Sequence, residues 1–401
     1  MMTLPGVDRR GGCIMNSRER VLTTLNHREP DRVPFDMGGT VLTGINVKAY
    51  TALRDYLGLP RIEPTIVDVV QQLAQVDDDV LDHLGVDVKN VAPRSSASYQ
   101  IEIKETEDGN YTYFYDEYGI GWRMPRAGGL YYDMFDHPLR GDIDESNFDC
   151  YVLPDPKDPA RFVGLREAAE RVVKEEQRAL VVGNLSAGIF EMYLWTRGFI
   201  DGYADFIGRP SLSQKIMYRF MDMQLAYWEK MFDVLGNMIN VVQLADDFAG
   251  QNNMLISPSS YRRYLKPLHK ELFDFIRSRS SAKIFLHSCG SIRKVIPDLI
   301  EIGLDIINPV QVSAAGMDSA ELKREYGKDL TFWGGGIDTQ RVFDENHTPE
   351  EVREDVKRRI IDLMPGGGFV YAAVHNIQGN VPPENIMAMW ETLQEYGTYT
   401  T

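Results

Sequence analysis

The sequence predicts a single (β/α)8 barrel, and three observations carry that prediction. Eight short apolar runs occur along the 401 residues, and from residue 238 onward they alternate with amphipathic segments of helix length. The connections between them are short there, which is typical of parallel strands joined by crossover helices. No G-x-G-x-x-G loop follows the first run, which disfavours an open doubly wound sheet. The predicted strands are Arg32–Met37, Asp87–Ala92, Ala179–Leu185, Met238–Asp246, Lys283–His287, Asp305–Val310, Asp329–Gly334 and Gly368–His375.

Three helices of the second half carry clear start and stop signals. Ser257-Pro258 supplies an N-cap and a first-turn proline for a helix that runs to Arg279. Thr348-Pro-Glu-Glu351 is a capping box, and the helix that it starts runs to Met364 before Pro365 ends it. The last helix begins at Pro382-Pro383-Glu384 and runs to about Tyr396. These helices occupy the positions that a barrel requires between and after its strands.

Two regions depart from the alternating pattern. Residues 1–85 are largely helical and form an N-terminal helical extension, of which 1–15 is expected to be a disordered or frayed tail. Residues of about 97–135 alternate in polarity around Asp108-Gly109, which predicts an inserted β-hairpin. We therefore expect one barrel domain over 16–401 that carries the hairpin as an insertion.

Composition narrows the class of protein. Lys and Arg number 43 against 59 Asp and Glu, and the resulting net charge of −16 argues against binding to a nucleic-acid backbone. No apolar run is long enough to cross a bilayer, and the N-terminus lacks the apolar core of a signal peptide. The three cysteines are too few for a disulfide framework, which favours a reduced, cytoplasmic protein.

The most informative residues lie where predicted strands end, because the C-terminal ends of barrel strands line the active site. His287-x-Cys289 follows the fifth strand, and side chains two residues apart on a strand project the same way. Imidazole and thiolate are donors that zinc prefers, and His375, at the end of the last strand, is the best third donor. Without a metal, the same motif would be a small buried cysteine beside a hydrogen-bonded histidine.

Other polar residues gather at the same strand ends. In the pair Asp246-Asp247, one carboxylate is expected to face the site while the other caps a helix or accepts a backbone N–H. The glycines at 334–336 either bind an anion through their N–H groups or only let the chain turn. The residues expected to bind substrate are Asn184, Glu191, Asp247, Gln251, Gln311, Gly335, Asp338 and Asn376.

Several segments together resemble one family. The opening Asn16–Pro34, Ser257–Pro267, Phe285–Gly290, Gly335–Asp338 and Val374–Asn376 are similar, in this order, to segments of the uroporphyrinogen decarboxylase superfamily. The similarity spans nearly the whole chain after Met15. It implies a (β/α)8 barrel with its site at the C-terminal mouth, in agreement with the strand count.

The superfamily resemblance implies two chemistries. True decarboxylases hold a tetrapyrrole with several carboxylates by an arginine-containing loop after the first strand, whereas residues 35–43 here contain no arginine. The corrinoid-dependent methyltransferase branch holds zinc by His-x-Cys and a later ligand, usually cysteine, and His287 and Cys289 match that pattern. No cysteine follows Cys289, so His375 would take the later position. Gln311 falls near the place where some relatives carry a carboxylate.

The sequence therefore leads to a cytoplasmic, zinc-dependent methyltransferase that works with a separate corrinoid-binding protein and a small methylated donor or acceptor thiol. Asp246 and Asp36, with His375, are the expected catalytic residues that orient the substrate or carry protons. Two alternatives stay open, a metal-free decarboxylase of the uroporphyrinogen type and a non-catalytic barrel binding protein. The resemblance also makes a homodimer plausible.

Overall fold

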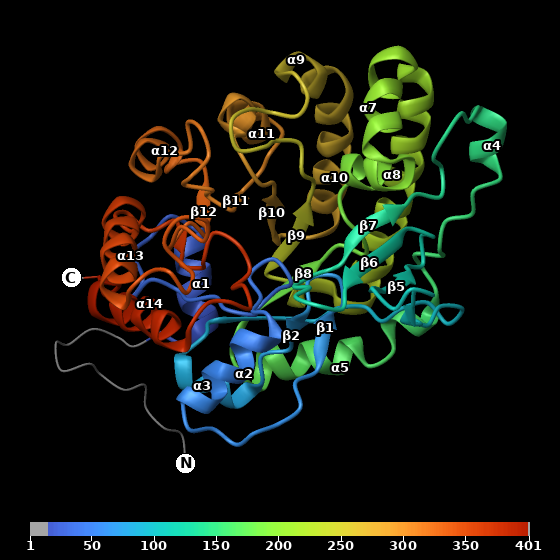
Figure 1. Cartoon of the computed structure of the whole chain (residues 1–401). Coiled ribbons are helices and arrows are strands. Elements are labelled where there is room, and N and C mark those ends of the chain that lie inside the picture. The colour runs from blue at the N-terminus through green and yellow to red at the C-terminus, as the bar shows by residue number, and fades with distance from the viewer. Residues whose placement is uncertain (1–14, 400–401) are drawn as a thin grey trace.

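A sheet of seven parallel strands forms the centre of the molecule in the computed structural model, which describes residues 15–399 (Figure 1). The strands lie in the spatial order β13-β12-β11-β10-β9-β8-β3, so each one neighbours the previous barrel strand of the chain. The predicted tail lies outside the described residues, apart from Met15. The strands are β3 (Val88–Asn90), β8 (Ala179–Gly183), β9 (Val241–Ala245), β10 (Lys283–His287), β11 (Ile306–Asn308), β12 (Thr331–Trp333) and β13 (Phe369–Val370).

The segment around Phe35 closes this sheet into the predicted (β/α)8 barrel. On one side, Tyr371 N donates to Pro34 O, and Asp36 N donates to Tyr371 O, each over 2.8 Å. On the other side, Asp87 N donates to Phe35 O over 2.8 Å. The predicted first strand, Arg32–Met37, is thus a pair of isolated bridges rather than a regular strand. Pro34 has no N–H to donate, which shortens the ladder at this edge.

Helices cover the outside of the barrel, and the three predicted from their caps are present. The first begins after the Ser257 N-cap, and one turn of it is a π-helix, η4 (Tyr261–Leu265). Thr348 and Glu351 form the predicted capping box. The outer helices are α6 (Ile189–Arg197), α7 (Phe199–Gly208), α8 (Pro210–Leu235), α9 (Pro258–Ser260), α10 (Lys266–Arg279), α11 (Ile296–Glu301), α12 (Ser319–Tyr326), α13 (Pro349–Leu363) and α14 (Pro383–Tyr396).

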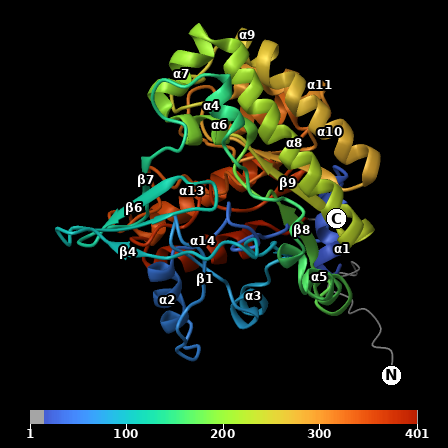
Figure 2. The same ribbon diagram turned by 90° about the vertical axis from the view of Figure 1, so that its right-hand side faces the viewer.

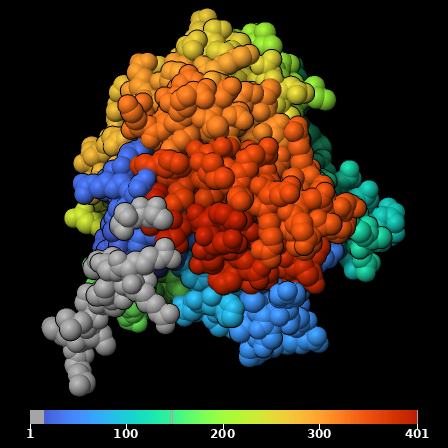
Figure 3. Space-filling model, turned by 90° about the vertical axis from the view of Figure 1, so that its left-hand side faces the viewer, coloured from blue at the N-terminus to red at the C-terminus, as the bar shows by residue number. Residues whose placement is uncertain are grey.

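Over residues 15–85 the N-terminal region contains three short helices and two short strands, so it is less helical than predicted, and it lies beside the C-terminal helices (Figure 3). Its elements are α1 (Ser17–Leu25), α2 (Val47–Tyr56), β1 (Ile66–Asp68), β2 (Leu73–Ala74) and α3 (Asp78–Leu84). Trp390 Nε1 in α14 donates to Leu84 O over 2.8 Å, which connects the last helix to the N-terminal region. Arg20 and Arg32 both bond to the buried Asp87 carboxylate at the start of the β3 segment. These contacts attach the N-terminal region to the barrel beside β3.

The inserted region is a four-stranded antiparallel sheet that projects beside the barrel (Figure 2), larger than the predicted hairpin. Its strands are β4 (Lys104–Glu105), β5 (Tyr111–Tyr115), β6 (Gly121–Pro125) and β7 (Asp133–Asp136). One face packs on the barrel, where the Trp122 and Trp195 rings lie 5.4 Å apart in an edge-to-face contact. The other face carries Tyr113, Tyr115 and Phe135, which contact one another.

Shorter helical segments connect the insertion to the barrel. They are α4 (Glu145–Asp149), η1 (Pro159–Phe162), α5 (Leu165–Glu170) and η2 (Arg171–Glu175). Two further short segments lie elsewhere in the barrel: η3 (Gly236–Met238) precedes β9, and η5 (Arg293–Val295) precedes α11. Among the helices of residues 15–399, none is both long and apolar enough to cross a membrane.

Candidate metal centre and active site

The end of β10 brings His287 and Cys289 together at the barrel mouth. The Cys289 Sγ lies 3.4 Å from the His287 Nε2, so the two donor atoms face the same point. Gly290 makes this turn possible: its φ is +90°, and a Cβ there would lie 2.6 Å from the Gly250 carbonyl oxygen. Only glycine meets both conditions without strain. Gly290 therefore allows the backbone turn that positions the Cys289 thiol.

Asn308, at the end of the neighbouring β11, determines how the His287 ring is presented. The His287 Nδ1 lies 2.6 Å from the Asn308 Oδ1, while the Asn308 Nδ2 donates to the Trp333 carbonyl over 2.8 Å. Because the Asn308 Nδ2 is committed to that carbonyl, its Oδ1 must accept, and Nδ1 of the ring must carry the proton. The Nε2 lone pair is then free toward Cys289, as a metal ligand requires.

Asp247 completes a triad of possible metal ligands. Its Oδ1 lies 4.0 Å from the His287 Nε2 and accepts the backbone N–H of Cys289 over 2.7 Å. One donor atom each from Asp247, His287 and Cys289 lies within 4.8 Å of the others. Burial, and then the charges of Asp247 and Glu191, raise the pKa of the Cys289 thiol well above its ordinary value. A cation at this point would reverse that preference and favour the thiolate.

His375, the third donor expected from the sequence, lies beside this cluster but outside the group of donor atoms within 4.8 Å of one another. Its ring centroid lies 6.4 Å from that of His287, in an edge-on arrangement. Burial, followed by the neighbouring His287, lowers the pKa of His375 to about 4, so the ring is neutral at pH 7. A neutral imidazole beside the triad can donate or accept one hydrogen bond to a bound molecule.

The two adjacent aspartates divide their tasks, and the structure assigns the helix cap to Asp246 rather than to Asp247. The Asp246 Oδ1 accepts the N–H groups of Phe190 and Glu191, each over 3.0 Å, at the start of α6. Its Oδ2 lies 2.9 Å from the His269 Nε2 in α10. With both oxygens engaged and 1% of the residue exposed, Asp246 is not available to substrate. Its contacts hold the start of α6 and the His269 ring in place.

Glu191 comes close to the triad because α6 begins directly above the end of β9. A Cβ on Gly188 would meet the Ala245 carbonyl oxygen at 2.1 Å, so only glycine allows the helix to approach this closely. Burial and then the carboxylates of Asp247 and Asp246 raise the pKa of Glu191 well above its ordinary value. The triad is therefore bordered by the carboxyl groups of Glu191 and Asp246.

Asp36, the other expected catalytic carboxylate, is buried and bonded to the protein itself. Its Oδ2 accepts from the Trp333 Nε1 over 2.8 Å, and its Oδ1 accepts from the Gly39 N–H over 3.0 Å. Burial raises the pKa of Asp36 to about 6. Only 1% of the residue is exposed, and these contacts join the first and seventh strands of the barrel.

The remaining expected site residues lie at strand ends but mostly bond to the protein itself. Asn376 accepts from the Gly44 N–H over 2.6 Å and donates to the Gln71 Oε1 over 2.8 Å, so it connects the loop after β13 to the N-terminal region. Gln311 accepts the N–H of Gly290. Three further hydrogen bonds join the side chains of Gln251 and Gln340, those of Asn184 and Trp228, and the Asp338 carboxylate to the Gln340 N–H. Gly335 has a φ of +82°.

The comparisons with known proteins agree with this architecture. Residues 118–396 match the family described as Uroporphyrinogen decarboxylase (URO-D). The chain belongs to this family. The superfamily resemblance expected from the sequence is thereby confirmed. No curated protein sequence matches the chain.

Solved structures resemble this URO-D family member in fold. One, described as a methyltransferase from Methanosarcina mazei, superposes with a TM-score of 0.63 at 17% identity and covers 95% of this chain and 99% of its own. A β-glucosidase from Pyrococcus furiosus gives a TM-score of only 0.40 at 10% identity, with 91% of this chain and 93% of that chain covered. The first likeness supports the barrel fold, and the second is too weak to add to it.

In this URO-D family member, the loop after the first strand segment carries no basic side chain that faces the mouth. Residues 36–44 contain neither lysine nor arginine, and Thr40 bonds to Thr43 within the loop. The first arginine beyond the loop, Arg54, lies in α2 and bonds through both Nη atoms to Asp79, each over 2.8 Å. The loop is therefore not built to hold several carboxylates.

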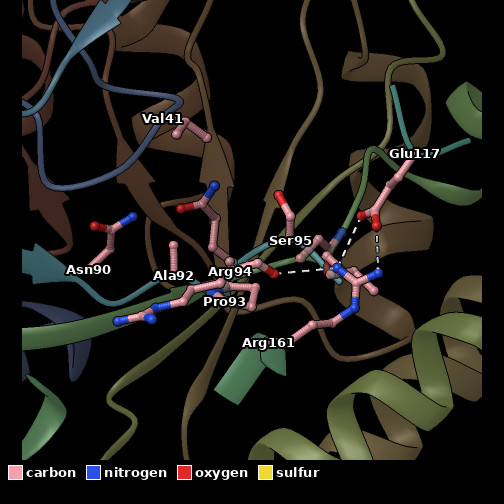
Figure 4. Close-up of a pocket in the computed structure, with 12 residues that line it drawn as sticks. Val41, Asn90, Ala92, Pro93, Arg94, Ser95, Glu117 and Arg161 are labelled. Atoms are coloured by element: carbon pink, nitrogen blue, oxygen red, sulfur yellow. Dashed lines mark hydrogen bonds and ion pairs between the residues drawn. The ribbon is translucent and has the colours of Figure 1, made fainter. Parts of the chain in front are cut away.

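Two adjoining cavities open beside the strand ends. The smaller measures about 230 Å³ and is lined by the ends of β3, β8 and β9 together with Arg94, Glu117 and Arg161 (Figure 4). The larger, of about 550 Å³, lies between the loop at 38–44, β2, β3 and α5. Arg94, Glu117 and Arg161 were not predicted from the sequence, because they lie in loops and in η1 without any periodic pattern. Asn308 lies within the predicted strand Asp305–Val310, but its contact with His287 was not predicted.

Proposed function

We propose that the protein is a cytoplasmic, zinc-dependent methyltransferase that moves a methyl group between a small methylated substrate, or an acceptor thiol, and a corrinoid carried by a separate protein. The observation that carries the proposal is the triad of Asp247, His287 and Cys289 at the barrel mouth, with donor atoms within 4.8 Å of one another. Family membership and the fold shared with a methyltransferase support it.

The donor set fits zinc. A catalytic zinc site uses three protein ligands of nitrogen, sulfur or oxygen and keeps one position open, and the triad offers one of each. Asn308 holds the His287 ring from behind, which is the usual support for a metal-bound imidazole. When bound, zinc would act as a Lewis acid toward a donor's oxygen or sulfur, or would keep an acceptor thiol in the thiolate form.

The chain's own residues bind and orient the reactants. His287, Cys289 and Asp247 fix the reacting end of the molecule, and His375 and Glu191 border the same space with a hydrogen-bonding ring and a carboxyl group. Asp246 and Asp36 act on the site indirectly, because they hold α6 and the Trp333 ring in place. The expected catalytic contribution of these two aspartates is therefore positional.

Decarboxylation is the other chemistry implied by the family, and the charge of the mouth weighs against it. A substrate with many carboxylates needs several free cations, whereas the loop at 36–44 has none and the triad is bordered by Glu191 and Asp246. The same carboxylates are compatible with a divalent metal ion, because its charge offsets theirs.

Metal content and turnover together test the proposal. Protein purified without added metal should contain about one zinc per chain, and Cys289→Ala should lose most of it while keeping its fold by circular dichroism. The wild type should exchange a methyl group with a free corrinoid in the presence of a small methylated donor, and the variant should not. Absence of zinc from the wild type, or turnover of uroporphyrinogen by metal-free protein, would overturn the proposal.

A further inference from the structure

The smaller cavity at the barrel mouth has an unusual balance of charges on its lining. Arg161 donates to Glu117 through two nitrogens, Nη1 to Oε1 over 3.0 Å and Nη2 to Oε2 over 2.7 Å, as Figure 4 shows. This guanidinium is therefore neutralised by a paired carboxylate. Arg94 lines the same cavity and, among the described residues, its side chain has no hydrogen-bonding or ionic partner. One free positive charge thus faces the cavity.

The adjoining larger cavity shares Arg94 but adds no second free cation. Lys89 bonds to Asp78 over 2.5 Å and to Glu176 over 3.0 Å, and Arg171 bonds to Glu176 over 3.2 Å. Both of these lining residues are already paired within residues 15–399. Arg94, which lines both cavities, is consequently the basic side chain that remains for a ligand.

Two carboxamides on the cavity lining also lack partners. Gln243 is 5% exposed, yet its side chain makes no hydrogen bond to any residue that the structure describes. It lies over Gly183, where a Cβ would be 3.9 Å from the Gln243 Nε2. Asn90, at the end of β3, is likewise without a side-chain partner in the described chain. Asn90 is only half-buried, but Gln243 is buried, and buried polar groups are nearly always satisfied, so the Gln243 amide points to a ligand in the cavity.

Strand register places this cavity next to the triad. Gln243 pairs with Phe285, and Ala245 pairs with His287, in the parallel ladder of β9 and β10. Gln243 and Ala245 face the same side because strand side chains alternate, and paired residues share a side. Gln243 and His287 are therefore on one face, two residues apart along neighbouring strands, with Cα atoms separated by roughly 8 Å.

We propose that the cavity binds the carboxylate of a small methylated acid, with Arg94 supplying the charge and Gln243 and Asn90 donating from their amide groups. The orientation of the acid rests on the proposed function: its methyl-bearing end would reach the triad of Asp247, His287 and Cys289. A volume of about 230 Å³ lies below the roughly 300–1,000 Å³ of drug-sized pockets, so the acid is small. One free cation matches a monoanion better than a phosphate dianion.

Binding to full-length, metal-free protein tests this inference without requiring turnover. Isothermal titration at pH 7 would compare methoxyacetate with methoxyacetamide, and 4-methoxybenzoate with 4-methoxybenzamide, with inorganic phosphate as a further probe. At least one acid should bind about tenfold more tightly than its amide, the gain typical of a charge-assisted hydrogen bond. Phosphate should bind more weakly than that acid.

Two variants and a matched control locate the effect. Arg94→Gln should reduce the preference for the acid to about twofold or less, and Gln243→Met, a substitution of similar size, should weaken binding of the acid several-fold. Arg171→Gln alters a paired arginine of the adjoining cavity and should leave the preference unchanged. Because Arg94 and Arg171 are exposed, both variants should fold.

Several results would overturn the inference. These are equal binding of acid and amide, tighter binding of phosphate, no binding of either acid, or an equal loss in Arg171→Gln. Because zinc is absent from the titration, failure here would leave the zinc site intact as a proposal. Conversely, loss of the zinc claim would leave a measured acid preference standing as a property of the cavity.

Discussion

Replacing Asn308 should weaken zinc binding without removing any ligand. The Asn308 Oδ1 lies 2.6 Å from the His287 Nδ1, and its Nδ2 is committed to the Trp333 carbonyl over 2.8 Å. In Asn308→Ala the ring loses the acceptor that fixes its tautomer and its rotation, so Nε2 no longer faces Cys289 in a single orientation. Loss of such a supporting bond typically costs about 10–100-fold in metal affinity, or roughly 1.4–2.7 kcal/mol.

The assay is competition for zinc with a fluorescent chelator at pH 7, which reports affinity independently of turnover. Asn308→Asp keeps an acceptor opposite Nδ1 but loses the donor to the Trp333 carbonyl, so its zinc affinity should lie between those of the wild type and Asn308→Ala. Asn385→Ala serves as the matched control, because Asn385 is also 1% exposed and donates two hydrogen bonds, to the Asp344 and His347 carbonyls, in a different part of the barrel.

Equal zinc affinity in wild type and Asn308→Ala would refute the reasoning, since His287 would then not depend on its neighbour. An equal loss in Asn385→Ala would also refute it, because the effect would then follow from general destabilisation. The expected pattern is a loss of zinc affinity that is specific to position 308, greatest in Asn308→Ala and smaller in Asn308→Asp.

Two further predictions concern the buried aspartates. Asp246→Ala removes the cap of α6 and leaves the Phe190 and Glu191 N–H groups without their acceptor. Urea unfolding should show that the free energy of unfolding falls by about 2–4 kcal/mol, well above the loss in Asp247→Ala. A larger loss in Asp247→Ala than in Asp246→Ala would contradict the assigned roles. Asp36 has its pKa raised by burial to about 6. The folded protein therefore keeps this proton while the unfolded chain releases it, so the free energy of unfolding falls as pH rises through the interval between about 4 and 6. Relative to Asp36→Asn, which does not titrate, the wild type should lose on the order of 2–3 kcal/mol between pH 4 and pH 7; a constant difference would contradict this.

The fold could be predicted because its signals are local and repeated. Apolar runs such as Ala179–Gly183 and Lys283–His287 are buried strands at the positions that the sequence indicated, and the capping box at Thr348 starts a helix as expected. The first strand was harder to place, since Pro34 limits it to isolated bridges. The insertion was underestimated because β7 has only two apolar residues, Met134 and Phe135, to mark it as a strand.

The site was predictable only as far as strand periodicity extends. His287 and Cys289 were found because they follow a regular strand directly. Beyond Ala245 the chain leaves β9, and the choice between Asp246 and Asp247 depends on where α6 and α10 pack, which no local pattern encodes. For the same reason the sequence did not indicate that Asp247, in the loop after β9, lies with His287 and Cys289. Gln243 did carry a signal, as the polar residue within the otherwise apolar strand Val241–Ala245.

We propose that one thiolate, one imidazole and one carboxylate hold a zinc ion at the mouth of the barrel. X-ray absorption at the zinc K-edge of the wild-type protein reports this ligand set. We expect one sulfur scatterer at about 2.3 Å, with the rest of the shell made of nitrogen and oxygen at about 2.0–2.2 Å. The sulfur should vanish in Cys289→Ala, and an oxygen should be lost in Asp247→Ala but not in His375→Ala. Two or more sulfur scatterers, none at all, or loss of a light scatterer in His375→Ala alone would contradict it.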